Sequence, residues 1–144
     1  MLFNPSRDDA RLFLFESWRK RRANELLTPL EALLAQLIEM HPEYHAILED
    51  PDRYQHRDYQ PEQGEANPFL HLMMHLTIEE QVSIDQPPGI REAVRQLAAK
   101  HGSEHEARHA VMDCLAEIVW QAQRNNVPFD NAAYLDCLAR KAER

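Results

Sequence analysis

Apolar residues recur along this chain every three or four positions, in several separate segments. The clearest run follows Thr28 and contains Leu30, Leu33, Leu34, Leu37 and Ile38. This spacing is that of one face of an α-helix. Similar patterns predict helices over about 5–22, 43–50, 68–84, 90–100 and 104–125, and a short one after Asp130. No segment alternates apolar and polar residues as a strand would. We therefore expect an all-α fold, a compact bundle of about six to seven helices.

Capping residues mark where several of these helices begin. Asn4-Pro5 and Asn67-Pro68 each combine an N-cap residue with proline at the first helical position. Thr28-Pro29-Leu30-Glu31 has the pattern of a capping box. Between the helices, residues 51–66 are polar and without periodicity, which predicts a long loop. That loop either covers a site or is mobile, and the sequence does not separate the two.

Length and charge narrow the class of protein. A chain of 144 residues suits one domain spanning residues 1–144. The net charge of −8 argues against nucleic acid as a partner. No apolar run is long enough to cross a bilayer and no secretory leader is evident, so no membrane partner is expected. Cys114 and Cys137 are far apart in sequence and are interpreted as buried thiols of a cytoplasmic protein.

The distinctive chemistry of the sequence is its histidine spacing. Six of the eight histidines form three pairs four residues apart, and each pair is followed four residues later by an acid. Four residues are about one helical turn, so each set of three lies along one helix face and two imidazoles there can share a metal ion. The three sets are His41/His45/Glu49, His71/His75/Glu79 and His105/His109/Asp113.

The second and third sets are the ones that favour binding of a metal ion. The helix at 68–84 is apolar nearly all round, which is typical of a buried helix. If the helix at 104–125 lies beside it, their histidines and acids meet in one interior. We therefore expect zinc or iron to bind through His71, His75 and His109, with further candidates His105, Glu79, His45 and Asp113. His41 precedes Pro42 at a helix boundary, so it need not share a face with His45.

No catalytic motif is present, and the sequence leaves open whether the protein is an enzyme. Any chemistry would involve a metal-activated water with Glu79 or Asp113 as the acid or base. The alternative is a metal-free helical interaction module, with or without assembly into a homodimer. The basic turn Arg19–Arg22 either complements a helix dipole or docks an acidic partner. The sequence identifies no small-molecule ligand.

Four segments resemble a known family: HPEYH at 41–45, NPFLHLMMHL at 67–76, EEQVSIDQPPGIR at 79–91, and 120–124. The chain is similar over nearly its whole length to a bacterial family catalogued as domain of unknown function number eighteen forty-one. That resemblance implies one whole-chain domain and no particular activity. His75/Glu79 and His105/His109 also loosely resemble the ligand pattern of hemerythrin-like bundles, but the expected His-x4-Asp is absent because Asp113 follows His109 by four.

Overall fold

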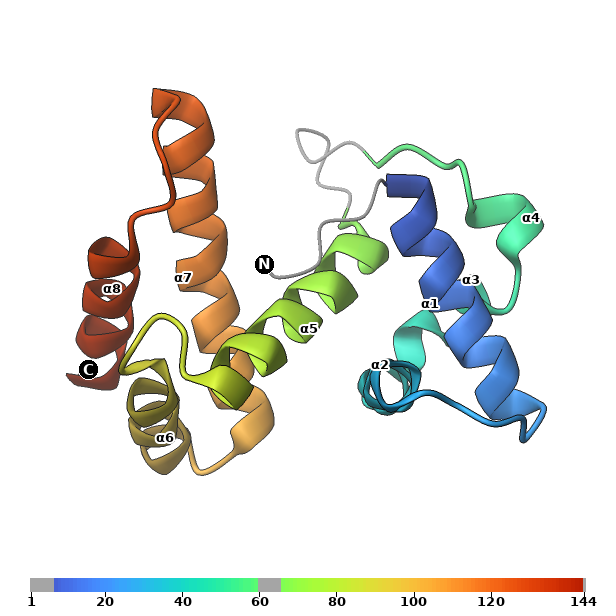
Figure 1. Cartoon of the computed structure of the whole chain (residues 1–144), viewed down its shortest axis with the longest axis horizontal. Coiled ribbons are helices and arrows are strands. Elements are labelled where there is room, and N and C mark those ends of the chain that lie inside the picture. The colour runs from blue at the N-terminus through green and yellow to red at the C-terminus, as the bar shows by residue number, and fades with distance from the viewer. Residues whose placement is uncertain (1–6, 60–65, 144) are drawn as a thin grey trace. The chain divides into compact units, whose positions relative to one another are not determined.

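The computed structural model of the chain describes residues 7–59 and 66–143 (Figure 1). Within them are eight α-helices and one 3-10 helix, without a strand, which confirms the all-α prediction. The elements are α1 (Arg7–Arg22), α2 (Pro29–Glu39), the 3-10 helix η1 (Pro42–Tyr44), α3 (His45–Leu48), α4 (Pro51–Tyr54), α5 (Pro68–Ile84), α6 (Ile90–His101), α7 (Glu104–Asn125) and α8 (Asn131–Glu143).

Side chains at the predicted caps satisfy the first N–H groups of several helices. At α2, the Thr28 hydroxyl accepts from the Glu31 N–H while the Glu31 carboxylate accepts from the Thr28 N–H, a complete capping box. At α5, Asn67 Oδ1 accepts from the N–H groups of Phe69 and Leu70. The predicted cap at Asn4-Pro5 lies outside the described residues. The N-termini of α2 and α5 are therefore set by residues next to them in the sequence.

The segment between α2 and α5 is more helical than expected. The single helix predicted at 43–50 is η1 followed by α3, because Pro42 begins a tight 3-10 turn. The loop predicted at 51–66 begins later than expected, since Pro51 starts the one-turn helix α4. Proline fits there because the first helical position needs no N–H donor. Residues 60–65 of that loop lie outside the described part.

The helices group into two compact units, and the boundary between Leu76 and Thr77 falls inside α5. The first unit holds α1 to α4 and the start of α5, and the second holds the end of α5 and α6 to α8. Each unit is described by itself below. That the whole chain behaves as one domain stays a prediction.

The core of the first unit is aliphatic and aromatic. Its buried residues come from α1, α2, α3 and α5: Leu14, Phe15, Trp18, Leu34, Leu37, Ile38, Leu48, Phe69, Leu72, Met73 and Leu76. Arg11 is buried with them at 2% exposure. Its Nη1 donates to the backbone carbonyls of Tyr54, Gln55 and Arg57, and its guanidinium lies over the Phe69 ring. Arg11 therefore connects α1 to the end of α4 and to the residues that follow it through hydrogen bonds.

The second unit buries one face of each of α6, α7 and α8. Val94, Leu97, Val111, Leu115 and Leu138 are all buried. Tyr134 is fully buried too, and its hydroxyl donates to Gln81 Oε1 at 2.8 Å. Burial raises the pKa of this phenol, so it remains a donor.

A disulfide between Cys114 of α7 and Cys137 of α8 corrects the interpretation of these residues as thiols. The two cysteines are 23 positions apart and on different helices, so their spacing gives no sign of the pairing.

None of the helices described is both long and apolar enough to cross a membrane.

Candidate metal site

Three histidines gather in the first unit, on the inner side of α5. His71 and His75 lie one turn apart on α5, as their spacing predicts, and their ring centroids are 4.9 Å apart. His41 reaches them from the turn between α2 and η1. His41 and His75 are buried, at 2% and 1% exposure, and His71 is half-buried. The site thus combines the predicted pair with one residue that the sequence analysis had left out.

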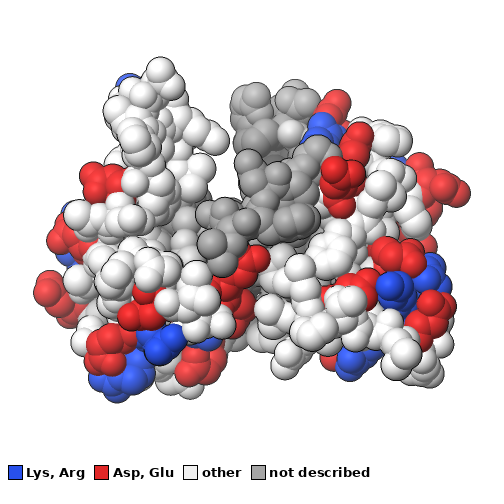
Figure 2. All heavy atoms as spheres, in the orientation of Figure 1, with Lys and Arg blue, Asp and Glu red and all other residues white. Residues whose placement is uncertain are grey.

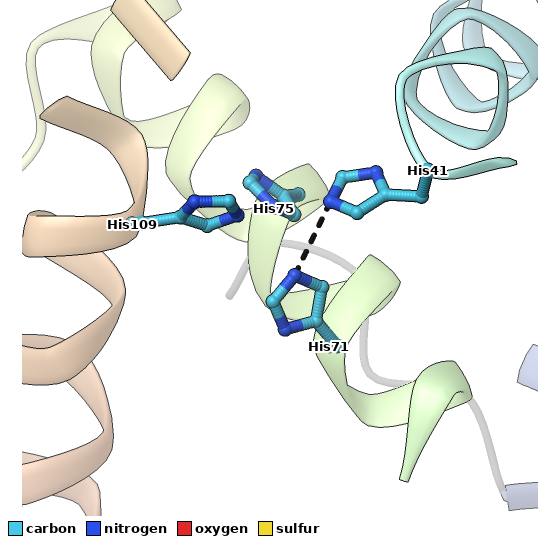
Figure 3. Close-up of side chains that lie close together, drawn as sticks. All are labelled: His41, His71, His75 and His109. Atoms are coloured by element: carbon cyan, nitrogen blue, oxygen red, sulfur yellow. Dashed lines mark hydrogen bonds between the residues drawn. The ribbon is translucent and has the colours of Figure 1, made fainter. Parts of the chain in front are cut away.

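The distances among the three rings are those of a possible ligand set. Each offers one ring nitrogen, and these nitrogens all lie within 4.8 Å of one another. Nε2 of His41 and Nε2 of His71 are 3.2 Å apart (Figure 3). Two nitrogens bound to one tetrahedral zinc at 2.0–2.1 Å would be separated by about 3.3 Å. The spacing therefore suits a shared metal ion without a large movement of either ring.

His41 is also held in the orientation and tautomer that a ligand requires. Its Nδ1 lies 2.8 Å from the Leu37 carbonyl oxygen, one turn back on α2. A carbonyl only accepts, so Nδ1 carries the proton and Nε2 presents its lone pair to His71 and His75. Metal-binding histidines in proteins commonly donate their second N–H in this way. The Leu37 carbonyl, near the C-terminal end of α2, thereby orients the His41 ring.

Aromatic contacts enclose the cluster on the side of η1. The Tyr44 ring stacks on His41, with ring planes 4° apart and centroids 5.6 Å apart, and meets His71 edge-on at 5.8 Å. Burial raises the pKa of the Tyr44 hydroxyl, so the residue is neutral. The neutral Tyr44 ring thus covers one side of His41 and adds no charge to the site.

His45, a candidate ligand from its spacing with His41, has a different environment. Its Nε2 lies 2.9 Å from the Ile38 carbonyl oxygen, and its ring packs against Trp18 with centroids 4.6 Å apart. Glu49, the acid of the same set, accepts from Trp18 Nε1 at 3.4 Å and pairs with Arg22. His41 and His45 thus bind successive carbonyls at the end of α2, and only His41 joins the cluster.

The remaining candidates belong to the second unit. On α7, the rings of His105 and His109 meet edge-on with centroids 4.3 Å apart. Glu79 of α5 accepts from Arg108 Nε at 2.8 Å, so its charge is matched by a guanidinium. Asp113 is 76% exposed and lies 3.9 Å from Lys141 Nζ.

The basic turn Arg19–Arg22 is internally matched by acids. Arg19 pairs with Glu16 and Glu25, and Lys20, Arg21 and Arg22 pair with one acid each, namely Glu31, Glu39 and Glu49. The bonds to Arg19 lower the pKa of both Glu16 and Glu25. On the face that Figure 2 shows, basic and acidic side chains likewise lie next to one another. These pairs support the structural interpretation of the turn over a docking site for an acidic partner.

Fold and site together define an all-α protein with a buried histidine cluster. The model of one protein family, domain of unknown function 1841, matches residues 6–140. The chain belongs to this family, as its sequence resemblance indicated. No curated protein and no solved structure matches the chain.

Proposed function

We propose that this protein binds a transition-metal ion, with zinc favoured over iron, through His41, His71 and His75. The observation that carries the proposal is the 3.2 Å separation of the His41 and His71 Nε2 atoms beside buried His75. Imidazole nitrogens suit zinc, copper and nickel better than magnesium or calcium. A non-haem iron site commonly adds a carboxylate, and the residues grouped here are histidines alone. This difference favours zinc.

We extend the proposal to His109 as the fourth ligand. His109 is kept as a candidate because of its four-residue spacing from His105 in the sequence. Four nitrogen ligands would close the coordination sphere, which is the arrangement of structural zinc sites. His105, Glu79, His45 and Asp113 then lie outside it as ring-packing, ion-pairing or capping residues.

The test is metal content and coordination in the purified full-length chain. After removal of metal and reconstitution with Zn²⁺ or Co²⁺, we expect about one ion per chain by elemental analysis and the visible spectrum of tetrahedral cobalt. The His41→Ala and His75→Ala variants should lose the ion. His109→Ala should weaken binding while the matched variant His105→Ala retains it. A chain that takes up no more metal than His75→Ala would overturn the proposal.

A metal-free helical interaction module is the second candidate, and one observation favours it. With Nδ1 of His41 donating to Leu37, its Nε2 can accept from His71 Nε2–H, and 3.2 Å is also a hydrogen-bond distance. In that case the cluster orders the core and binds no ion. A homodimer belongs to this second candidate, and a bacterial source is what the family resemblance implies. A cytoplasmic setting stays a proposal, although the disulfide removes the two free thiols on which it rested. We assign no reaction.

A further inference from the structure

We infer that Cys114 and Cys137 form a reversible thiol–disulfide pair, with Cys137 as the sulfur that exchanges with a small thiol such as glutathione. The inference rests on the second unit alone and is independent of metal binding. The cysteines join α7 to α8 with their Cα atoms 5.9 Å apart. This is an ordinary separation for bridged cysteines, so the bond closes on helices that already lie at the required distance.

Contacts other than the disulfide also hold α8 in place. Leu138 is fully buried, as is Tyr134, whose hydroxyl binds Gln81 on α5. Near the end of α8, Lys100 Nζ donates to the Lys141 carbonyl at 2.7 Å, and Lys141 also approaches Asp113 of α7. These contacts remain when the sulfur–sulfur bond opens. We therefore expect the reduced protein to keep its fold, which a reversible pair requires.

Exposure distinguishes the two sulfurs. Cys114 is fully buried in the core of the second unit, whereas Cys137 is half-buried on α8. An attacking thiolate must reach the sulfur it bonds to, and a buried cysteine is protected from attack. Attack is thus directed to Cys137, and Cys114 is the leaving group.

The exchange balances as two successive displacements. A glutathione thiolate bonds to Cys137 Sγ while the Cys114–Cys137 bond breaks, and its electron pair leaves on Cys114 Sγ, which takes a proton. A second glutathione thiolate attacks the glutathione sulfur of the mixed disulfide and releases Cys137 as thiolate. The protein is reduced by two electrons, and two glutathione molecules become one glutathione disulfide. The reverse sequence oxidises the pair.

The first experiment titrates the full-length protein in mixtures of reduced and oxidised glutathione. After acid quenching and alkylation, mass spectrometry counts the free thiols while far-ultraviolet circular dichroism reports the helices. We expect zero to two alkylated cysteines as reduced glutathione rises, reversibly and with unchanged helix content. Loss of helix on reduction would make the bond a permanent structural link. Thiols that stay free in excess oxidised glutathione would exclude the pair. Either result overturns the inference.

The second experiment identifies the exchanging sulfur. In Cys114→Ser, Cys137 should form a mixed disulfide with oxidised glutathione, while in Cys137→Ser the buried Cys114 should react at least tenfold more slowly. Should either variant fail to fold, wild-type protein treated briefly with one equivalent of glutathione and trapped with acid gives the same information by peptide mapping. Mixed disulfide found mainly on Cys114 would contradict the assignment.

Discussion

Nε2 of His41 and Nε2 of His71 lie 3.2 Å apart, although 30 positions separate the two residues in the chain. The two nitrogens connect the end of α2 to α5, bridged either by a hydrogen bond or by a shared metal ion. Added metal raises the free energy of unfolding only in the second case, because an ion that binds only the folded chain stabilises it by mass action. Thermal stability therefore reports which of them the protein adopts.

Zinc is expected to raise the melting temperature of the wild-type protein. A ligand in about 100-fold excess over its Kd contributes about 2.7 kcal/mol to the free energy of unfolding. His71→Ala should remove the shift, because a ligand nitrogen is lost. His101→Ala is the matched control, since His101 is exposed at the end of α6 and should leave the shift intact. Differential scanning calorimetry with and without zinc checks both, and equal shifts in the two variants would contradict the assignment.

Replacing His45 should change stability and leave metal content unaltered. His45→Ala removes the bond to the Ile38 carbonyl and the packing against Trp18. Loss of one such hydrogen bond costs about 1 kcal/mol of unfolding free energy. Urea denaturation measures this cost, and elemental analysis after zinc reconstitution measures the metal. A variant that keeps its stability and loses its zinc would return His45 to the set of ligands.

The sequence predicted most of the helices, the caps at Thr28 and Asn67 and one pair of site residues, because these depend on neighbours within one turn. His71 and His75 share a face by spacing alone. His41 was missed because its direction depends on the 3-10 turn at Pro42 and on a hydrogen bond to Leu37, neither of which the helical pattern of apolar residues encodes. The only local sign was the interval of four from Leu37 to His41. Pairings across helices, such as Cys114 with Cys137, depend on packing and have no local sign.

The stability of the first unit should fall in acid partly through Glu31. Hydrogen bonds from the Thr28 N–H and from Lys20 lower the pKa of this carboxyl below its ordinary value of 4.5. A lowered pKa in the folded state means that the stabilisation is fully present above pH 4.5 and is lost as the pH falls through the folded-state value. Glu31→Gln should therefore be less stable near neutral pH and lose less on acidification.

Chemical denaturation of wild type and Glu31→Gln at a series of pH values below 5 checks this expectation, since about one unit either side of a pKa covers the transition. The charge-matched control is Glu117→Gln, at an exposed position on α7. Parallel stability curves for wild type and Glu31→Gln would show that Glu31 contributes nothing to the acid sensitivity.

Arg11 should be among the most sensitive positions of α1. Arg11→Met keeps most of the side-chain volume but removes the donor to the carbonyls of Tyr54, Gln55 and Arg57. Hydrogen bonds from a charged group are worth about 1.5–3 kcal/mol, so we expect a loss of about 2–3 kcal/mol in urea denaturation. Arg7→Met is the control, because Arg7 bonds to Asp58 and Arg57 at the surface and should cost less than about 1 kcal/mol. Equal losses would contradict a special role for burial.

The position of the unit boundary inside α5 limits how this chain can be divided. Leu72 and Leu76 are buried before the boundary and Ile78 after it, within one helix of 17 residues. Cutting the chain there would leave two segments shorter than the roughly 12–15 residues that an isolated helix needs to persist in water. Each fragment would also expose aliphatic side chains that the intact helix buries. An insertion or a proteolytic cut at this point should therefore destabilise both units together.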